Sequence, residues 1–329
     1  MITEGCFLAI SNAKADLPLA VGPTISATFL SSFGEIMFIA TLIAKESLNE
    51  RDIQSAIASL AAVDATIIRK SELIDGRVVD IFFQGDPVAA RVKLEIIEGD
   101  IDIAVQPEAN RLKKLLISDM DSTMITVECI DELADYAGIK SEIAEITERA
   151  MQGELDFEEA LRGRVALLEG LQTSAIQQCL DERVKIMPGA EILVRTMAKR
   201  EATTILVSGG FTKFASPVAR AIGFGSFHAN ILGEAGGLLT GGLEGQIVDS
   251  ARKVEVLESA AQVASLPLEQ CIAVGDGAND IPMLERAGLG IAYHAKPKAA
   301  QAADVAIKYN DLSALLYIQG IAVDQWVIG

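Results

Sequence analysis

Two aspartates follow an apolar stretch of the chain and raise a question of charge. Residues 115–125 read LLISDMDSTMI, so Asp119 and Asp121 come directly after the apolar part. Side chains two residues apart on a strand point to the same side, and two carboxylates placed together repel each other. A neighbouring negative charge raises the pKa of a carboxyl group, so we expect Asp121 to hold a proton. Such a pair is a candidate for metal binding, for acid–base catalysis or for both.

Further polar residues end two other apolar stretches and open one predicted helix. The two stretches are residues 203–210, TTILVSGG, and residues 270–280, QCIAVGDGAND. Each polar position taken alone has an ordinary interpretation as a helix cap, a capped turn or a surface lysine, so only their combination indicates a site. The additional candidates are Ser208, Gly209, Lys253, Asp276, Asn279 and Asp280.

Three short apolar segments position most of these residues. They are residues 114–121, 203–210 and 270–277, and each ends in small or acidic residues. Buried strands of a parallel sheet have this composition, and the ligands of such sheets bind beyond the carboxyl ends of the strands. The sequence therefore predicts an α/β fold with a Rossmann-like parallel sheet core and a site at one edge of that sheet.

The chain between the first two of these segments is longer than a strand crossover requires. A βαβ unit takes about 30 residues, whereas residues 124–188 alone form a long stretch of helical segments such as VECIDELADYAG and DFEEALRGRVALLEG. An insertion directly after the carboxylate loop would cover the site. Lids of this kind exclude water and hold the substrate, so we expect an inserted helical cap here.

The residues before this core have a different pattern. The order strand, helix, hairpin, helix, strand over residues 34–107 predicts a small α+β unit of the ferredoxin-like kind. Asn49 and Asp86 are the expected N-caps of the two helices, and Asp75 with Gly76 is the expected hairpin turn. The sequence thus predicts an α+β fold for residues 34–107 and an α/β fold for the residues that follow.

We therefore divide the chain into two domains. Residues 1–108 form the expected ferredoxin-like N-terminal domain, and residues 109–329 form the expected catalytic core with its cap at about residues 124–188. Residues 1–33 carry no clear periodicity and could add an edge strand or an arm.

Composition argues against several classes of function. The formal net charge of −18 over 329 residues disfavours a nucleic acid or an anionic membrane as partner. The four cysteines are scattered and the chain has only two histidines, so a disulfide framework, a zinc site or a Ser-His-Asp hydrolase is not expected. We recognise no signal peptide and no apolar stretch of about 18 residues, and we expect a cytoplasmic protein without a membrane span.

The order of the motifs resembles that of the haloacid dehalogenase-like hydrolases over about residues 113–310. Within them the chain is most similar to the phosphoserine phosphatase family, because of the segments DMDST, VECIDELA, ITERAMQGELDFEEALRGRVALLEGL, VSGGF, VGDGANDIPML and GIAYHAKP. The N-terminal unit resembles, by its topology, the ACT-type regulatory modules found beside enzymes of amino-acid metabolism. The resemblance implies a Mg²⁺-dependent phosphatase of serine biosynthesis.

The implied reaction is hydrolysis of O-phospho-L-serine to L-serine and phosphate through an aspartyl-phosphate. Asp119 would attack the phosphorus atom, and Asp121 would protonate the departing serine oxygen and then take a proton from the attacking water. Mg²⁺ would be held by Asp119, by the backbone carbonyl of Asp121 and by Asp276.

The resemblance also implies how the substrate is bound. Glu128 would bind its ammonium group and Arg164 its carboxylate. The phosphoryl group would meet Ser208, the N–H of Gly209 and Lys253. The remaining implied roles are loop support for Thr123, an apolar cover for Met151 and Phe157, orientation of the phosphate or water for Asn279, and support of the metal site for Asp280.

Two alternatives to this function stay open. The first is a phosphatase or phosphotransferase of the same fold that acts on another small phosphate. The second is a sensor that binds serine or phosphoserine without turnover. The partners implied by the main interpretation are O-phosphoserine as substrate, serine as a regulator and a second copy of the chain in a homo-oligomer.

Overall fold

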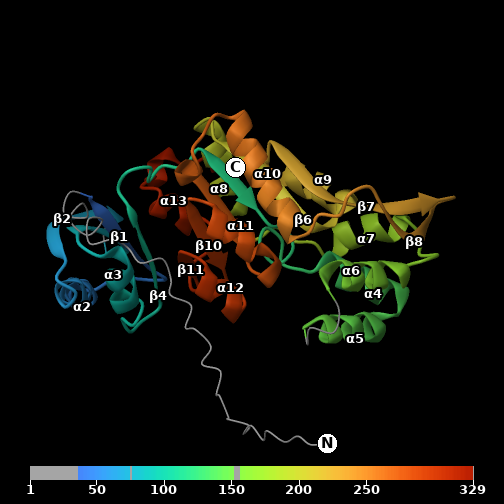
Figure 1. Ribbon diagram of the computed structural model, residues 1–329, viewed down its shortest axis with the longest axis horizontal. Coiled ribbons are helices and arrows are strands. Elements are labelled where there is room, and N and C mark those ends of the chain that lie inside the picture. The colour runs from blue at the N-terminus through green and yellow to red at the C-terminus, as the bar shows by residue number, and fades with distance from the viewer. Residues whose placement is uncertain (1–35, 75, 152–155, 329) are drawn as a thin grey trace, which may run out of the picture.

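Two β-sheets organise the protein. The computed structural model describes residues 36–74, 76–151 and 156–328. A four-stranded sheet lies toward the N-terminus and a seven-stranded sheet in the remainder. In Figure 1 the first sheet lies at one end of an elongated molecule and a group of helices at the other, with the larger sheet between them. The edge strand or arm considered for residues 1–33, and Asp75 of the expected turn, lie outside the described residues.

The N-terminal unit follows the order βαββαβ that its sequence indicates. Its strands pair antiparallel in the order β2-β3-β1-β4. Its elements are β1 (Phe38–Ala44), α2 (Glu50–Ala61), β2 (Thr66–Ile74), β3 (Val78–Gln84), α3 (Pro87–Leu94) and β4 (Ile101–Pro107).

Local capping explains where the two helices of this unit begin. The Asn49 side chain accepts the N–H groups of Arg51 and Asp52, and the Asp52 carboxylate accepts the N–H of Asn49, which completes a capping box. Asp86 accepts two N–H groups at the start of α3. Both expected caps are therefore present.

The larger sheet has β5 (Leu115–Ser118) at its centre. This strand pairs in parallel with β6 (Thr203–Phe211) on one side and with β9 (Cys271–Gly275) on the other. The full order is β11-β10-β9-β5-β6-β7-β8. The expected parallel sheet is confirmed, and the other strands are β7 (Ser226–Ala235), β8 (Leu238–Glu244), β10 (Leu289–Tyr293) and β11 (Val305–Ile307).

Helices cover both faces of this sheet, which explains why its strands are almost wholly apolar. Leu116 of β5 packs into one hydrophobic cluster, whereas Leu115 and Ile117 pack into the cluster on the opposite face. The α-helices outside the cap are α8 (Ala190–Lys199), α9 (Thr212–Ile222), α10 (Ser250–Val263), α11 (Ile281–Arg286), α12 (Pro297–Ala302) and α13 (Ala314–Ile318), and the short 3-10 helices are η2 (Leu268–Gln270), η3 (Ala278–Asp280) and η4 (Val323–Gln325).

Four helices occupy the region where residues 124–188 predict an insertion. They are α4 (Cys129–Ala137), α5 (Lys140–Met151), α6 (Phe157–Ala166) and α7 (Ser174–Glu182). A bridge between Ile125 and Ile186 closes the base of the insertion. Helix α6 packs on strand β8 of the β7–β8 hairpin, and Figure 1 shows the four green helices beside that hairpin. No helix of the described residues combines the length and apolar character that a membrane crossing needs.

The N-terminal sheet is joined to the larger part of the molecule through buried ionic and apolar contacts. Arg111 donates to both carboxylate oxygens of Asp80, each at 2.8 Å, and its Nε donates to the Ile318 carbonyl at 2.9 Å. Ile43 and Val78 pack in the same hydrophobic cluster as the core of the parallel sheet. The helix-free face of the N-terminal sheet is therefore an internal surface of the protein.

Candidate active site

The predicted site residues gather at the carboxyl edge of the parallel sheet. Asp119 follows β5, Ser208 lies near the end of β6, and Asp276 follows β9. A cavity of about 110 Å³ opens there between the sheet and the cap. Its lining residues are Asp119, Asp121, Glu128, Ile130, Phe157, Leu161, Arg164, Gly209, Gly210, Phe211, Asp276, Gly277, Asn279 and Lys296.

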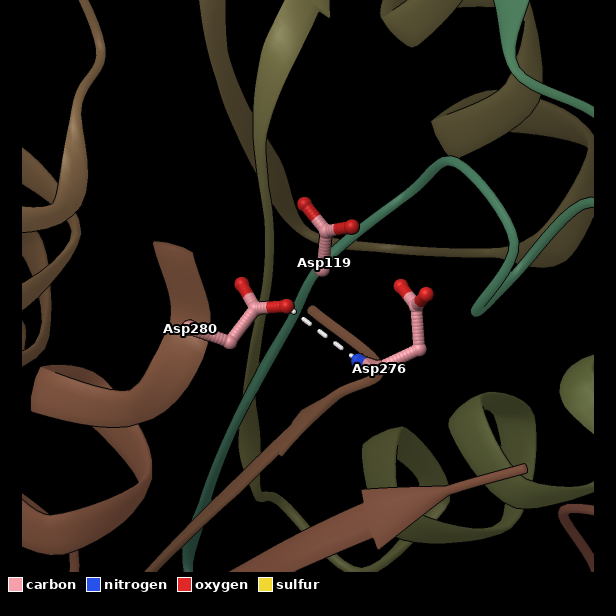
Figure 2. Close-up of side chains that lie close together, drawn as sticks. All are labelled: Asp119, Asp276 and Asp280. Carbon is pink, nitrogen blue, oxygen red and sulfur yellow. Dashed lines mark hydrogen bonds between the residues drawn. The ribbon is translucent and has the colours of Figure 1, made fainter. Parts of the chain in front are cut away.

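Three buried carboxylates form a cluster that could hold a metal ion. Asp119, Asp276 and Asp280 each offer an oxygen, and these oxygens lie within 4.8 Å of one another. Figure 2 shows the three side chains arriving from separate segments, with Asp280 on the helical turn that follows β9. Carboxylate oxygens are the ligands that hard divalent cations prefer.

Both oxygens of Asp280 are already engaged within the protein. Oδ1 accepts from Lys253 Nζ at 2.6 Å, and Oδ2 accepts the N–H groups of Asp276 and Gly277 at 3.2 and 3.0 Å. The dashed line in Figure 2 marks the hydrogen bond from the Asp276 N–H to Asp280 Oδ2. Asp280 therefore holds the loop that carries Asp276.

Lys253 is buried and bridges two carboxylates. Its ammonium lies 2.5 Å from Asp119 Oδ1 and 2.6 Å from Asp280 Oδ1. Burial lowers the pKa of Lys253, but the charges of Asp119 and Asp280 outweigh it, so the pKa stands above its ordinary value. Burial raises the pKa of Asp119 and Lys253 opposes that shift. A bound cation would lower it further, because positive charge favours the carboxylate form.

Asp121 faces different partners from Asp119. Its Oδ1 accepts the Cys129 N–H at 3.1 Å and its Oδ2 accepts the Ser208 hydroxyl at 3.3 Å. Burial, followed by the charge of Glu128, raises the pKa of Asp121 to about 7. The expected direction is confirmed, but the expected cause, the charge of Asp119, is wrong: desolvation is the main cause.

Asp276 is the third carboxyl group at the sheet edge with a raised pKa. Burial and the charges of Asp280 and Glu128 raise its pKa to about 6, while Lys296 and a hydrogen bond from Thr123 act in the opposite direction. The Thr123 hydroxyl donates to Asp276 Oδ1 at 3.2 Å. Thr123 thus ties the loop after β5 to the loop after β9.

The cap contributes charged and apolar groups to the cavity. Glu128 accepts the Ser122 hydroxyl at 2.6 Å. Arg164 Nε donates to the Ala160 carbonyl at 3.2 Å, and its other guanidinium donors have no hydrogen-bond partner among the described residues. The Phe157 ring lies close over Gly209, 3.1 Å from where a Cβ atom would stand. The Met151 side chain lies outside the described part of the structure.

Gly210, which lines the cavity, is constrained by its neighbours. A Cβ atom on Gly210 would stand 2.6 Å from Asp121 Oδ2 and 3.0 Å from Ser208 Oγ. The Ser208 hydroxyl also accepts the Gly210 N–H at 2.8 Å. Only glycine fits here, because any side chain would displace Asp121.

Several lining residues were not predicted from the sequence. They are Ile130, Leu161, Gly210, Phe211, Gly277 and Lys296. Of these, Lys296 is charged and lies in the loop after β10, within the segment GIAYHAKP. The sequence could have indicated Lys296, because β10 is another strand of the parallel sheet and its carboxyl end lies at the same edge.

The family of the chain follows from comparison with known proteins. The family model described as haloacid dehalogenase-like hydrolase matches residues 113–288. The chain belongs to the haloacid dehalogenase-like hydrolases. The matched range holds the proposed catalytic carboxylates and the whole helical cap of this hydrolase.

Curated relatives of this hydrolase are phosphoserine phosphatases. The protein of that name from Streptomyces coelicolor is 40% identical over 242 residues, covering 73% of this chain and 59% of the relative. The chain therefore spans less than two thirds of that relative's length. The phosphoserine phosphatase of Saccharomyces cerevisiae is 35% identical over 304 residues, covering 88% of this chain and 97% of the relative.

A solved structure shares the fold over most of the hydrolase. The unliganded crystal structure of a probable phosphoserine phosphatase from Vibrio cholerae superposes with a TM-score of 0.70 at 31% identity. The match covers 89% of this chain and 89% of that one.

Proposed function

We propose that this hydrolase is a phosphoserine phosphatase, which converts O-phospho-L-serine and water to L-serine and phosphate. The observation that carries the proposal is the cavity itself. It places the buried carboxylates Asp119, Asp121 and Asp276 of the core opposite Glu128 and Arg164 of the cap. The names of the relatives support the same substrate.

In the first step Asp119 attacks phosphorus, so that a carboxylate–phosphorus bond forms and the bond from phosphorus to the serine oxygen breaks. The departing oxygen needs a proton, and Asp121 supplies it. A pKa of about 7 suits this task, because the group is protonated at the start and readily loses its proton. In the second step Asp121 takes a proton from the water that cleaves the aspartyl-phosphate.

The donor set suits Mg²⁺. Asp119, Asp276 and the backbone carbonyl of Asp121 would hold it, and the metal supplies positive charge to the phosphoryl group. The fit rests on the buried carboxylates of Asp119 and Asp276, whose oxygens lie within 4.8 Å of each other and whose pKa values burial raises, so that a cation between them would favour their charged forms. Asp280 supports the site through Lys253 and the Asp276 loop.

The remaining groups divide between the two ends of the substrate. The Gly209 N–H, Ser208, Lys253 and Asn279 serve the phosphoryl end. In the cap, Glu128 serves the ammonium and Arg164 the carboxylate, both of which line the cavity. A planar guanidinium matches a carboxylate with two parallel hydrogen bonds.

We further propose that residues 1–108 form a ferredoxin-like, ACT-like domain beside the catalytic residues 109–329. The antiparallel order β2-β3-β1-β4 with its two helices supports this assignment. Serine binding by this domain, assembly into a homo-oligomer and a cytoplasmic location belong to the same proposal.

The test is phosphate release from O-phosphoserine by the full chain, with and without Mg²⁺. We expect turnover that needs the metal. Adding alcohol acceptors such as homoserine separates hydrolysis from phosphotransfer, because transfer would yield a phosphorylated acceptor in place of free phosphate. Binding without phosphate release would point to a sensor and would overturn the proposal.

A further inference from the structure

Lys296 lines the active-site cavity and has no role in the mechanism above. It follows β10 and precedes α12, and it lines the cavity together with Asp276, Gly277 and Asn279. Within the described residues its ammonium forms no hydrogen bond or ion pair. It is close enough to Asp276 for its charge to act on that carboxyl group. A cation in this position is free to meet a ligand.

The balance of charge in the cavity indicates what that ligand is. Four carboxylates line it, namely Asp119, Asp121, Glu128 and Asp276. The buried Lys253 already pairs with Asp119 and Asp280, and Arg164 lies in the cap. Among the described residues that line the cavity, Lys296 is therefore the side-chain cation without an ion pair on the core side, where a phosphoryl group must approach Asp119.

The loop that carries Lys296 is held in a defined conformation. The Lys296 N–H donates to the Asp276 carbonyl at 3.0 Å. Two residues earlier, His294 adopts a left-handed conformation with φ of 44°. Its N–H donates to the Ile307 carbonyl at 2.8 Å, and its Nε2 lies 2.9 Å from the carbonyl oxygen of Asn310.

The anchor of this loop lies in the N-terminal sheet. Asp102 of β4, which is 2% exposed, accepts both the backbone N–H and the side-chain amide of Asn310 at 2.9 Å, and the Lys308 N–H at 2.7 Å. Hydrogen bonds thus connect Asp102 through Asn310 to His294, which lies two residues from Lys296. A carboxylate with several N–H donors fixes a loop firmly.

We propose that Lys296 binds the phosphoryl group of the substrate, and that Asp102, Asn310 and His294 are positioning residues that hold its loop at the cavity. The proposal rests on the phosphatase chemistry proposed above but not on serine as the leaving group. It gives the N-terminal sheet a direct part in building the active site.

The first test measures phosphate binding and an aryl phosphate as substrate. Replacing Lys296 by alanine should weaken inhibition by inorganic phosphate about five- to thirtyfold and lower kcat/KM for the aryl phosphate by a similar factor, which corresponds to about 1–2 kcal/mol. Lys296→Arg should recover most of the loss. Lys298→Ala is the matched control, because Lys298 is an exposed lysine in the first turn of the following helix α12 and lies outside the cavity.

Three results of this test would count against the phosphoryl assignment. Unchanged inhibition by phosphate in Lys296→Ala would overturn it. A loss seen with phosphoserine but absent with the aryl phosphate would assign Lys296 to the amino-acid end instead. An equal loss in Lys298→Ala would reduce the effect to general surface charge. Failure of the wild-type protein to hydrolyse phosphoserine, with the aryl phosphate still cleaved, would refute the proposed substrate and leave this inference intact.

The second test separates positioning from general stability by a double-mutant cycle. His294→Asn keeps a residue type that tolerates positive φ but shortens the side chain that reaches Asn310. Alone it should weaken phosphate inhibition about two- to fivefold. In a Lys296→Ala background it should add nothing, because its effect passes through Lys296. Additive losses would overturn the positioning role.

Discussion

Asp119 and Asp121 are neighbours in the chain, yet each carboxylate meets its own partners. Strand β5 ends at Ser118, so the two residues lie in the following loop and the alternation of a strand no longer orients them. Asp119 turns to Lys253, while Asp121 turns to Ser208 and the Cys129 N–H. Asp119 therefore lies beside a cation, whereas Asp121 contacts two neutral groups and has a raised pKa, so that it holds a proton more readily.

The first residue-scale prediction concerns the nucleophile. Asp119→Asn preserves the shape of the side chain but removes the attacking charge and one proposed metal ligand. Activity on phosphoserine should fall to near background, measured as released phosphate after mass spectrometry has excluded deamidation. Asp324→Asn, at an exposed position far along the chain, is the control. Retention of a tenth of wild-type activity by Asp119→Asn would contradict the assignment.

The second residue-scale prediction concerns how Asp121 makes the stability of the fold depend on pH. Its folded-state pKa is raised to about 7 from 3.8, so the protonated form contributes stability that is lost as pH rises from about 4 through 7. Asp121→Asn cannot ionise and should avoid this loss. Without divalent metal, the difference in Tm between Asp121→Asn and wild type should be more positive at pH 8 than at pH 5. Each 1 kcal/mol of unfolding free energy that the wild type loses over this range corresponds to about 2–4 °C. Activity on phosphoserine should fall at both pH values.

This comparison has a clear negative outcome. A Tm difference between Asp121→Asn and wild type that is the same at pH 5 and pH 8 would show that Asp121 does not carry the raised pKa. Asp324→Asn should give a flat difference over the same range.

At the scale of elements, the cap and the sheet contribute different groups to the cavity. The sheet edge carries the carboxylates, and helix α6 brings Arg164 and Phe157 over them. The capping box of Asp156 and Glu159 fixes where α6 begins, next to the ring that covers Gly209. Under the proposed function, the cap would select the substrate and the sheet edge would carry the phosphorus chemistry.

This division predicts a selective effect for Arg164→Ala. Hydrogen bonds to charged groups contribute about 1.5–3 kcal/mol, so kcat/KM for phosphoserine should fall roughly ten- to a hundred-and-fifty-fold. An aryl phosphate has no carboxylate, and its hydrolysis should change by less than about threefold on the same reasoning. Arg162→Ala is the matched control, because Arg162 lies on the same helix and pairs with Glu158 in solvent. Parallel losses with both substrates would assign Arg164 to cap structure.

At the scale of the whole molecule, the N-terminal sheet shares its core with the catalytic part. Ile43, Val78 and Ala104 pack in the cluster that also contains Leu116 of β5. Arg111 and Asp80 form a two-point ion pair across the same junction. Separation of the two parts would expose apolar surface and leave buried charges unpaired.

A chain shortened to residues 111–329 should therefore be less stable than the full chain. The apolar contacts of Ile43 and Val78 alone represent about 3–6 kcal/mol, so the Tm should fall by roughly 10 °C or more. A chain of residues 36–329 is the matched control, because it retains the whole described N-terminal sheet. Equal Tm values for residues 111–329 and residues 36–329 would refute the shared core. If the sheet also binds serine, inhibition by serine should weaken only in the shorter chain.

The sequence by itself determined what short segments encode. The N-caps Asn49 and Asp86 act within three residues, and the apolar strands β5, β6 and β9 are recognisable because both of their faces are buried. The motif order then indicated the sheet edge at which Asp119, Asp121 and Asp276 meet.

Only the tertiary structure decided the contacts between distant segments. Strand order and the docking of the two sheets bury Asp121 and bring Lys253 to Asp280. They also place Lys296 at the cavity and Asp102 within hydrogen-bond distance of the 308–310 loop. Asp102 and Lys308 are 206 residues apart and Lys253 and Asp280 are 27 apart, whereas the desolvation of Asp121 depends on burial by the whole fold, so no local pattern reports these features.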